Sequence, residues 1–248
     1  MKHLVGCILF FLSYGYAAES FANSQECVIL IHGLARTEKS MLLMKNELSA
    51  KGYHVVNEKY ASRRQSIEQL AVDNLPKWVD KCKGIGKAPI HFIAHSMGGI
   101  LLRYYLEKNN IEHLGHVVML GPPNQGSEVV DKLKFIPGFY FINGPAGRQL
   151  GTSKKSIPKQ LNPVTFKLGV IAGNRSMNLL LSLFLPNPDD GKVSVASTRV
   201  EGMCSFVSLP VTHPFLMKKK AVIKEALHFL EHGEFRHQNA ENELCRTS

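Results

Sequence analysis

The chain has 248 residues, 44% of them hydrophobic, which is enough for one sizeable core in a single domain. The formal net charge is +10, but no basic run alternates with aromatic residues as in a base-stacking surface, which argues against nucleic-acid binding. The longest basic run, Lys218–Lys220, is typical of a solvated helix face, and attraction to an anionic membrane or an acidic partner is the functional alternative.

The first 22 residues have the layout of a secretory signal peptide. A short positive start precedes an apolar run over 4–12, and small residues follow for cleavage near Ala18 or Ala22. The apolar run is too short to span a bilayer comfortably, although an uncleaved anchor is the alternative. We therefore expect a secreted or periplasmic protein.

Export changes how the cysteines are interpreted. Removal of Cys7 with the signal peptide leaves four cysteines, an even number, which in an oxidising compartment predicts two disulfides with three connectivities open. Buried free thiols are the alternative. The four are Cys27, Cys82, Cys204 and Cys245.

Strands and helices alternate through the first half of the chain. Continuous apolar runs predict strands buried on both faces, and 3.6-residue spacing predicts helices. The expected strands are 27–34, 53–56 and 89–94, and the expected helices are 37–50, 65–82 (with Pro76 as a kink or break) and the stretch after Ser96. This alternation is typical of βαβ units in a doubly wound sheet.

The second half begins with a strand at 116–121, after which the rhythm breaks. Residues 133–163 are rich in Gly, Pro and aromatics, which predicts a lid-like insertion. Strands are then expected at 168–173, 193–196 and 203–209, followed by a closing amphipathic helix at 215–232. The predicted organisation is one domain over 23–235 with a polar tail at 236–248.

Ser96 lies in the sequence Ala94-His95-Ser96-Met97-Gly98, between an apolar strand and a helix. Small residues at Ala94 and Gly98 leave room for a sharp turn that lifts a hydroxyl clear of a sheet, with the Met97 N–H at a helix N-terminus as an oxyanion donor. The second donor is expected from the loop after the first buried strand, at the Leu34 N–H.

A serine nucleophile needs a base and a carboxylate that orients the base. His213 is the expected base because its loop follows a strand at the same sheet edge as Ser96. His95 and His32 are expected to support the site and the His-Gly loop. Asp190, in the turn before Gly191, is the expected acid, and Asp189 is the alternative acid. An Asp-Asp-Gly cluster that only forms a turn, with no catalytic role, is the structural alternative.

The chain order Ser96, Asp190, His213 is that of the α/β-hydrolase fold. Together with His32-Gly33-Leu34, Pro122-Pro123-Asn124-Gln125-Gly126-Ser127 and Thr212-His213-Pro214, these motifs resemble exported bacterial α/β-hydrolases of the triacylglycerol lipase/esterase type. Ala94 departs from the glycine usual in this family. The resemblance implies a mostly parallel doubly wound sheet with helices on both faces and an irregular lid or cap insertion after the sixth strand region.

The resemblance also implies pairings and roles. It supports Ser96 as nucleophile, Asp190 as acid, His213 as base, and Leu34 and Met97 as backbone donors. Its strand arrangement favours the disulfides Cys27–Cys82 and Cys204–Cys245 over the other connectivities. Carboxylates for the calcium site of some such lipases cannot be placed here, so no metal and no cofactor are expected.

The sequence therefore predicts a serine hydrolase that cleaves carboxylic esters, such as lipids, through an acyl-enzyme. A monomer is assumed. Aromatic residues of the insertion (Phe135, Phe139, Tyr140, Phe141) and the apolar run 179–185 suggest an acyl pocket, with a buried satellite cluster as the alternative. Acyl transfer on the same residues, or an inactive hydrolase fold that binds lipid or protein, are the competing functions.

Overall fold

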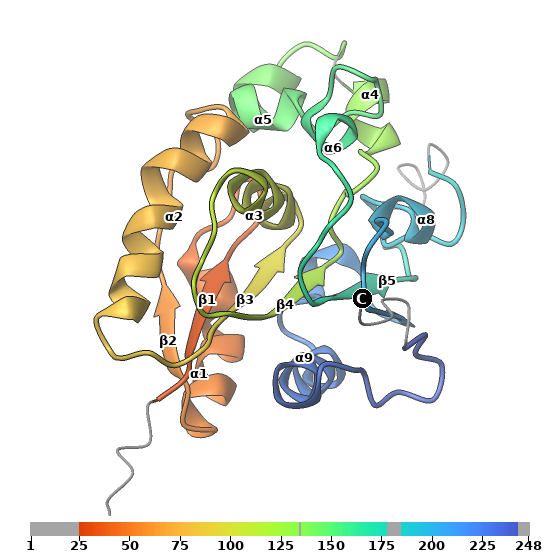
Figure 1. Cartoon of the computed structure of the whole chain (residues 1–248). Coiled ribbons are helices and arrows are strands. Elements are labelled where there is room, and N and C mark those ends of the chain that lie inside the picture. The colour runs from red at the N-terminus through yellow and green to blue at the C-terminus, as the bar shows by residue number, and fades with distance from the viewer. Residues whose placement is uncertain (1–24, 134, 178–184, 243–248) are drawn as a thin grey trace, which may run out of the picture.

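The computed structural model describes residues 25–133, 135–177 and 185–242, and its centre is a parallel sheet (Figure 1). Six strands lie in the order β2-β1-β3-β4-β5-β6, and all five neighbouring pairs are parallel. The strands are β1 (Cys27–Ile31), β2 (His54–Asn57), β3 (Ile90–His95), β4 (Leu114–Leu120), β5 (Leu168–Gly173) and β6 (Ser205–Leu209). The expected mostly parallel sheet is confirmed.

The strand order places a switch point between β1 and β3. The chain leaves β1 toward β2 on one side and returns to β3 on the other, so the connections diverge at this point. In open parallel sheets, ligands bind at such points, outside the carboxyl ends of the strands. Ile31 is paired with Ala94, so the segments that begin at His32 and Ser96 leave the sheet side by side.

Helices cover both faces of the sheet because its strands are apolar on both faces. One face packs against α2 (Ile67–Lys83) and α3 (Met97–Lys108), and the other packs against α1 (Leu42–Ala50) and α9 (Lys220–His232) (Figure 1). Alternate residues of β1 face opposite cores: Ile29 faces α2 and α3, whereas Leu30 faces α1 and α9. A short 3-10 helix, Glu38–Met41, leads into α1. Pro76 lies inside α2, which continues through it.

The predicted insertion at 133–163 differs from expectation in place and in structure. It follows β4, the fourth strand along the chain, rather than a sixth strand region. The region is also partly helical: α5 (Phe139–Arg148) and α6 (Ile157–Gln160) lie within it, and α4 (Glu128–Leu133) ends at its first residue (Figure 1). Gly144, where φ is 65°, kinks α5 directly before Pro145.

The strand expected at 193–196 is wrong. The structure has a one-turn helix there, α8 (Val195–Thr198), because the Ser194 side chain accepts a hydrogen bond from the Ser197 N–H and caps the turn. A 3-10 turn (His213–Phe215) precedes α9, which is shorter than the helix expected from residue 215. Beyond α9 the chain returns to the sheet, where Glu241 pairs with Phe206 in an antiparallel bridge.

The cysteines and the termini are described in part. Cys27 and Cys82 form a disulfide that joins the start of β1 to the last turn of α2, as the resemblance implied. Cys204 is buried, and its predicted partner Cys245 lies outside the described residues, as does the predicted signal peptide. Within residues 25–133, 135–177 and 185–242, no helix is both long and apolar enough to cross a membrane.

Candidate active site

Ser96 occupies a strained turn between β3 and α3. Its backbone has φ 55° and ψ −125°, a combination that non-glycine residues rarely adopt and that persists at functional sites where the surroundings enforce it. The surroundings here are close: a Cβ on Gly98 would lie 2.7 Å from the Ile31 carbonyl oxygen and 2.8 Å from that of His32. The small residue expected at Gly98 therefore lets the start of α3 approach the end of β1.

A chain of hydrogen bonds runs from Ser96 to a buried carboxylate. The Ser96 hydroxyl lies 2.9 Å from His213 Nε2, and His213 Nδ1 lies 2.6 Å from Asp190 Oδ2. The tautomer that satisfies both contacts has Nδ1–H donating to Asp190 and Nε2 accepting from Ser96. In this arrangement the imidazole can take the hydroxyl proton while the carboxylate stabilises the resulting cation.

The backbone around the Asp-Asp turn distinguishes the two aspartates. Asp190, which is 1% exposed, also accepts hydrogen bonds from the Lys192 and Val193 N–H groups through its other oxygen, Oδ1. The Asp189 side chain instead accepts from the Gly191 N–H, which is local turn chemistry. The His213 N–H donates to the Asp190 carbonyl oxygen, so the two loops are tied together by backbone as well as by side chains.

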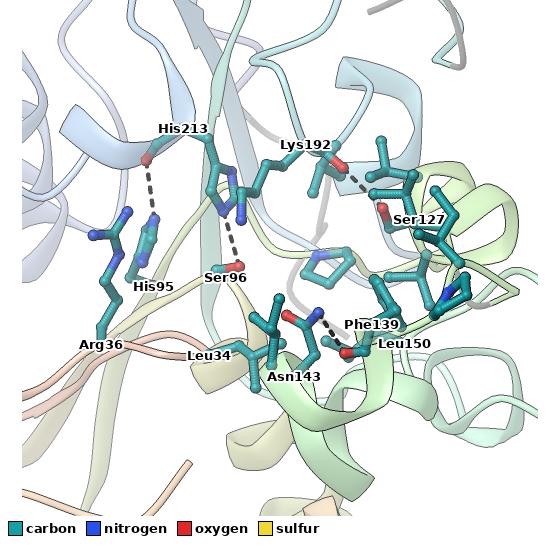
Figure 2. Close-up of a pocket in the computed structure, with 18 residues that line it drawn as sticks. Leu34, Arg36, His95, Ser96, Ser127, Phe139, Asn143, Leu150, Lys192 and His213 are labelled. Atoms are coloured by element: carbon teal, nitrogen blue, oxygen red, sulfur yellow. Dashed lines mark hydrogen bonds between the residues drawn. The ribbon is translucent and has the colours of Figure 1, made fainter. Parts of the chain in front are cut away.

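His95 and His32 are buried beside the site, and neither contacts the Ser96 hydroxyl. His95 Nε2 donates to the His213 carbonyl oxygen at 3.1 Å (Figure 2). Burial lowers the pKa of His95 well below its ordinary value, and the nearby His213 imidazole lowers it further, so His95 is a neutral support. His32 stacks on Tyr60 at 4.1 Å between ring centroids, and burial lowers its pKa too.

The loop after β1 is held open beside Ser96. The Arg36 N–H donates to the Gly33 carbonyl oxygen and closes a turn in which Ala35 has a φ of 55°. The Ala35 N–H donates to the Ser62 hydroxyl, which anchors the turn from outside. The Leu34 N–H has no acceptor within the described part of the chain, so it is free to donate to a ligand oxygen.

An apolar pocket opens in front of the Ser96 hydroxyl (Figure 2). Its volume is about 410 Å³, in the range of small-molecule sites. Besides Ser96 and His213, it is lined mostly by hydrocarbon from the β1 loop, α4, α5 and the Asp-Asp turn: Leu34, Pro123, Val129, Val130, Leu133, Ile136, Pro137, Phe139, Ile142, Leu150 and Val193. A pocket of this size and polarity suits an alkyl or acyl chain.

The aromatic residues predicted to form an acyl pocket are only partly there. Phe139 lines the pocket, but Phe135 and Phe141 do not and are 81% and 91% exposed. The Tyr140 side chain and the run 178–184 lie outside the described residues. The aliphatic residues that make up most of the wall were not predicted, because their spacing in α4 and α5 is also that of ordinary helix faces.

Two cations at the pocket mouth were also missed. Arg36 lies two residues after the expected donor Leu34, and Lys192 follows the Asp190-Gly191 turn, so adjacency to the predicted motifs was the available signal. Figure 2 shows Arg36 beside His95 and the Lys192 side chain extending toward His213. Burial lowers the pKa of Lys192, as does the charge of Arg36, while Asp190 raises it. In residues 25–133, 135–177 and 185–242, no three His, Cys, Asp or Glu side chains are grouped to hold a metal.

Comparison with known proteins places the chain in a family. A family model described as palmitoyl protein thioesterase matches residues 27–162, more than half of the chain. No curated protein matches the sequence.

Solved structures share the fold at low identity. The lipase BlEst2 of Bacillus licheniformis in its mature form has a TM-score of 0.70 and 18% identity, with 84% of this chain and 93% of that chain covered. Lipase B of Aspergillus fumigatus has a TM-score of 0.62 and 14% identity, with 85% and 54% covered. Phospholipase PlaB of Legionella pneumophila has a TM-score of 0.56 and 18% identity, with 76% and 53% covered. The chain belongs to the palmitoyl protein thioesterase family and is a carboxylic ester hydrolase with the α/β-hydrolase fold of lipases and esterases.

Proposed function

We propose that the protein cleaves fatty acyl esters or thioesters through an acyl-enzyme formed on Ser96. The observation that carries this proposal is the unbroken hydrogen-bond chain from Ser96 through His213 to Asp190. The Ser96 end of this chain lines an apolar pocket that suits an acyl chain. The family description suggests a long acyl chain attached to a thiol, and the wall of aliphatic residues suits such a chain.

The first step transfers the acyl group to the enzyme. His213 takes the Ser96 proton while the Ser96 oxygen attacks the acyl carbonyl carbon. The Leu34 and Met97 N–H groups stabilise the resulting oxyanion, and the imidazolium is stabilised by Asp190. Collapse of the intermediate breaks the bond to the leaving alcohol or thiol, which departs with the proton from His213. The products of this step are the free leaving group and an ester on Ser96.

Water then repeats the sequence on the acyl-enzyme. His213 removes a proton from the water, the hydroxide adds to the ester carbonyl, and the returning proton restores the Ser96 hydroxyl as the fatty acid leaves. Segment 133–163 contributes one wall of the pocket in this account, with Phe139 and Ile142 against the acyl chain. Export through the 1–22 signal peptide is part of the proposal, and the Cys27–Cys82 disulfide is consistent with an oxidising compartment.

A hydrolysis series tests the proposal. p-Nitrophenyl esters with acyl chains from butyrate to palmitate are compared on wild type, Ser96→Ala and Ser49→Ala, an exposed serine on α1 at the other face of the sheet. We expect Ser96→Ala to lose about 10⁴-fold or more in kcat and Ser49→Ala to match wild type. Activity that survives in Ser96→Ala would exclude Ser96 as nucleophile. A folded wild type without activity on any ester would favour the binding-module alternative.

A further inference from the structure

A second cavity adjoins the acyl pocket on the side of the β1 loop. Its volume is about 650 Å³, and Arg36 lines both cavities. The loop between β2 and α2 supplies the rest of its charged wall. Its cationic lining residues are Arg36, Lys59, Arg63 and Arg64, and none of the residues that line it is acidic. We call this cavity the basic groove.

The charges of the basic groove are largely unneutralised. The side chains of Arg36, Lys59 and Arg64 form no ion pair with any described residue, and the Arg63 guanidinium donates only to the Ile142 carbonyl oxygen. Two nearby carboxylates are engaged elsewhere, because Glu58 pairs with Lys81 and Glu68 accepts from Gln149. A third, Glu38, follows the lining residue Thr37 and does not itself line the cavity. Like charges gathered without ion-pair partners raise the local concentration of anions.

The groove is built on the same frame as the expected oxyanion loop. Ser62, one of its lining residues, accepts the hydrogen bond from the Ala35 N–H, and the Tyr60 hydroxyl donates to the His32 carbonyl oxygen. On the other side, Gly144 packs so closely that a Cβ there would lie 1.8 Å from the Arg63 carbonyl oxygen. The cations therefore project from a backbone that is fixed relative to Ser96.

Each of the two cavities can hold a different part of a substrate. An acyl chain in the apolar pocket leaves its carbonyl at Ser96, so the leaving group must exit past another wall. Arg36 is shared by both cavities and lies close enough to His95 to lower the pKa of that imidazole, which places the groove at the reacting centre.

We propose that the basic groove binds a phosphate-bearing leaving group, so that the preferred substrates are acyl esters or thioesters of a phosphorylated alcohol or thiol. This inference rests on the proposed function. Guanidinium groups bind phosphate through paired N–H donors, and several cations around one cavity suit a group with more than one negative charge. The leaving group is either a glycerol phosphate, as in an anionic lipid, or a phosphorylated thiol.

Monomeric substrates with one acyl chain test the proposal. Octanoyl-coenzyme A is compared with the neutral thioester octanoyl-N-acetylcysteamine, and 1-octanoylglycerol 3-phosphate with the neutral ester 1-octanoylglycerol, all below their micelle concentrations. For wild type we expect kcat/KM to favour the phosphate-bearing member by about tenfold or more in at least one pair, with the preference falling as salt rises. The pair that shows it identifies the source of the phosphate.

Two double variants that each remove two positive charges test whether the preference for phosphate-bearing substrates comes from the basic groove. Lys59→Gln/Arg64→Gln removes two cations from the groove, whereas Lys77→Gln/Lys224→Gln removes two exposed cations on the outer sides of α2 and α9. We expect the first to bring the preference to about twofold or less while its activity on neutral substrates stays within about twofold of wild type. The second should keep the wild-type preference.

The outcomes separate this inference from the function on which it rests. If wild type hydrolyses the neutral and phosphate-bearing substrates equally, the groove proposal is overturned and the hydrolase stands. Equal loss of preference in both double variants would assign the effect to net charge and also overturn it. Failure to hydrolyse any octanoyl substrate would overturn both proposals.

Discussion

At the scale of single residues, the contact of 2.9 Å between the Ser96 hydroxyl and His213 Nε2 depends on local chain geometry and on the order of the segments along the chain. A small-x-Ser-x-small turn after an apolar strand allows the hydroxyl to point in few directions other than out of the sheet. The loop after β6, which carries His213, lies at the same edge because the strands are parallel. The choice between Asp189 and Asp190 depends on which carboxylate the turn directs inward, and that is set by the backbone donors of Lys192 and Val193. Arg36 carried no motif of its own, so only the structure could place it beside His95.

The two aspartates provide a matched pair of variants. Asp190→Asn removes the carboxylate that contacts His213 at 2.6 Å, and we expect kcat to fall by about 10³-fold to 10⁴-fold. Asp189→Asn keeps that contact and alters the carboxylate that accepts from the Gly191 N–H, so kcat should fall less than about tenfold. Steady-state hydrolysis of p-nitrophenyl butyrate measures both. The reverse order of effects would make Asp189 the acid.

At the scale of elements, the strands were predictable and the connections were less so. Leu168–Gly173 is a strand over the predicted residues because a continuous apolar run in this sheet is buried on both faces. Val193–Ala196 alternates like a strand, but Ser194 caps a helical turn.

The loops behind the site depend on Arg103, whose guanidinium donates to the Asn124, Leu161 and Asn162 carbonyl oxygens. Burial lowers the pKa of Arg103 to about 10. No periodicity predicts such a contact.

Gly98 and Gly99 test how closely α3 must approach β1. In Gly98→Ala the new methyl group meets the Ile31 and His32 carbonyl oxygens, which belong to the backbone and cannot move without shifting the loop after β1. We expect a loss of about 1–3 kcal/mol in unfolding free energy and at least about a tenfold loss in kcat.

Gly99→Ala is the control, because its methyl group would meet the Met119 sulfur and the Pro122 Cβ at 3.1 and 3.2 Å. The Met119 side chain can adjust, so kcat should stay within about threefold of wild type. Chemical denaturation and ester hydrolysis on both variants give the comparison. Equal effects would show that the position of Ser96 does not depend on the close approach of Gly98.

At the scale of the whole molecule, a disulfide adds to the stability that the hydrophobic cores provide, and buried histidines make it depend on pH. The Cys27–Cys82 disulfide ties the first strand to the second long helix, at the sheet end opposite Ser96. His91, within β3, is 3% exposed, and burial lowers its pKa to about 4. The nearby His116 lowers this pKa too, although the His116 N–H donates to His91 Nδ1. Neither feature touches the reacting groups, so both should affect folding without affecting chemistry.

The disulfide closes a separation of 55 residues, which predicts a loss of about 4 kcal/mol when it is removed. Urea denaturation of Cys27→Ser, Cys82→Ser and the double variant measures this loss. Because the link is broken once either cysteine is replaced, we expect the second substitution to add little to the first. Additive losses would mean that the two cysteines contribute through burial alone.

Because His91 is buried with a lowered pKa, we expect the free energy of unfolding to decrease in acid. The pKa of His91 is about 4 in the folded protein against an ordinary 6.5. Between these values the imidazole binds a proton in the unfolded chain but stays neutral in the folded protein. Stability should therefore fall as the pH decreases from about 6.5 to about 4, by on the order of 3 kcal/mol from this group, and then level off.

The unfolding free energy of wild type and His91→Gln across pH 4 to 7 checks this linkage. We expect His91→Gln to lose part of the wild-type slope over that interval, with the remainder due to other buried histidines such as His95 and His32, whose pKa values are also lowered by burial. An unchanged slope in His91→Gln would show that His91 binds protons equally in both states.

The assignment of Ser96 as the nucleophile is tested most directly by covalent labelling. Wild type, Ser96→Ala and Ser49→Ala are treated with a fluorophosphonate and measured by intact-protein mass spectrometry, and the modified peptide is then sequenced. We expect one adduct per chain in wild type and Ser49→Ala, located on Ser96, and none in Ser96→Ala. An adduct on any other residue, or a folded wild type that takes no label, would contradict the account.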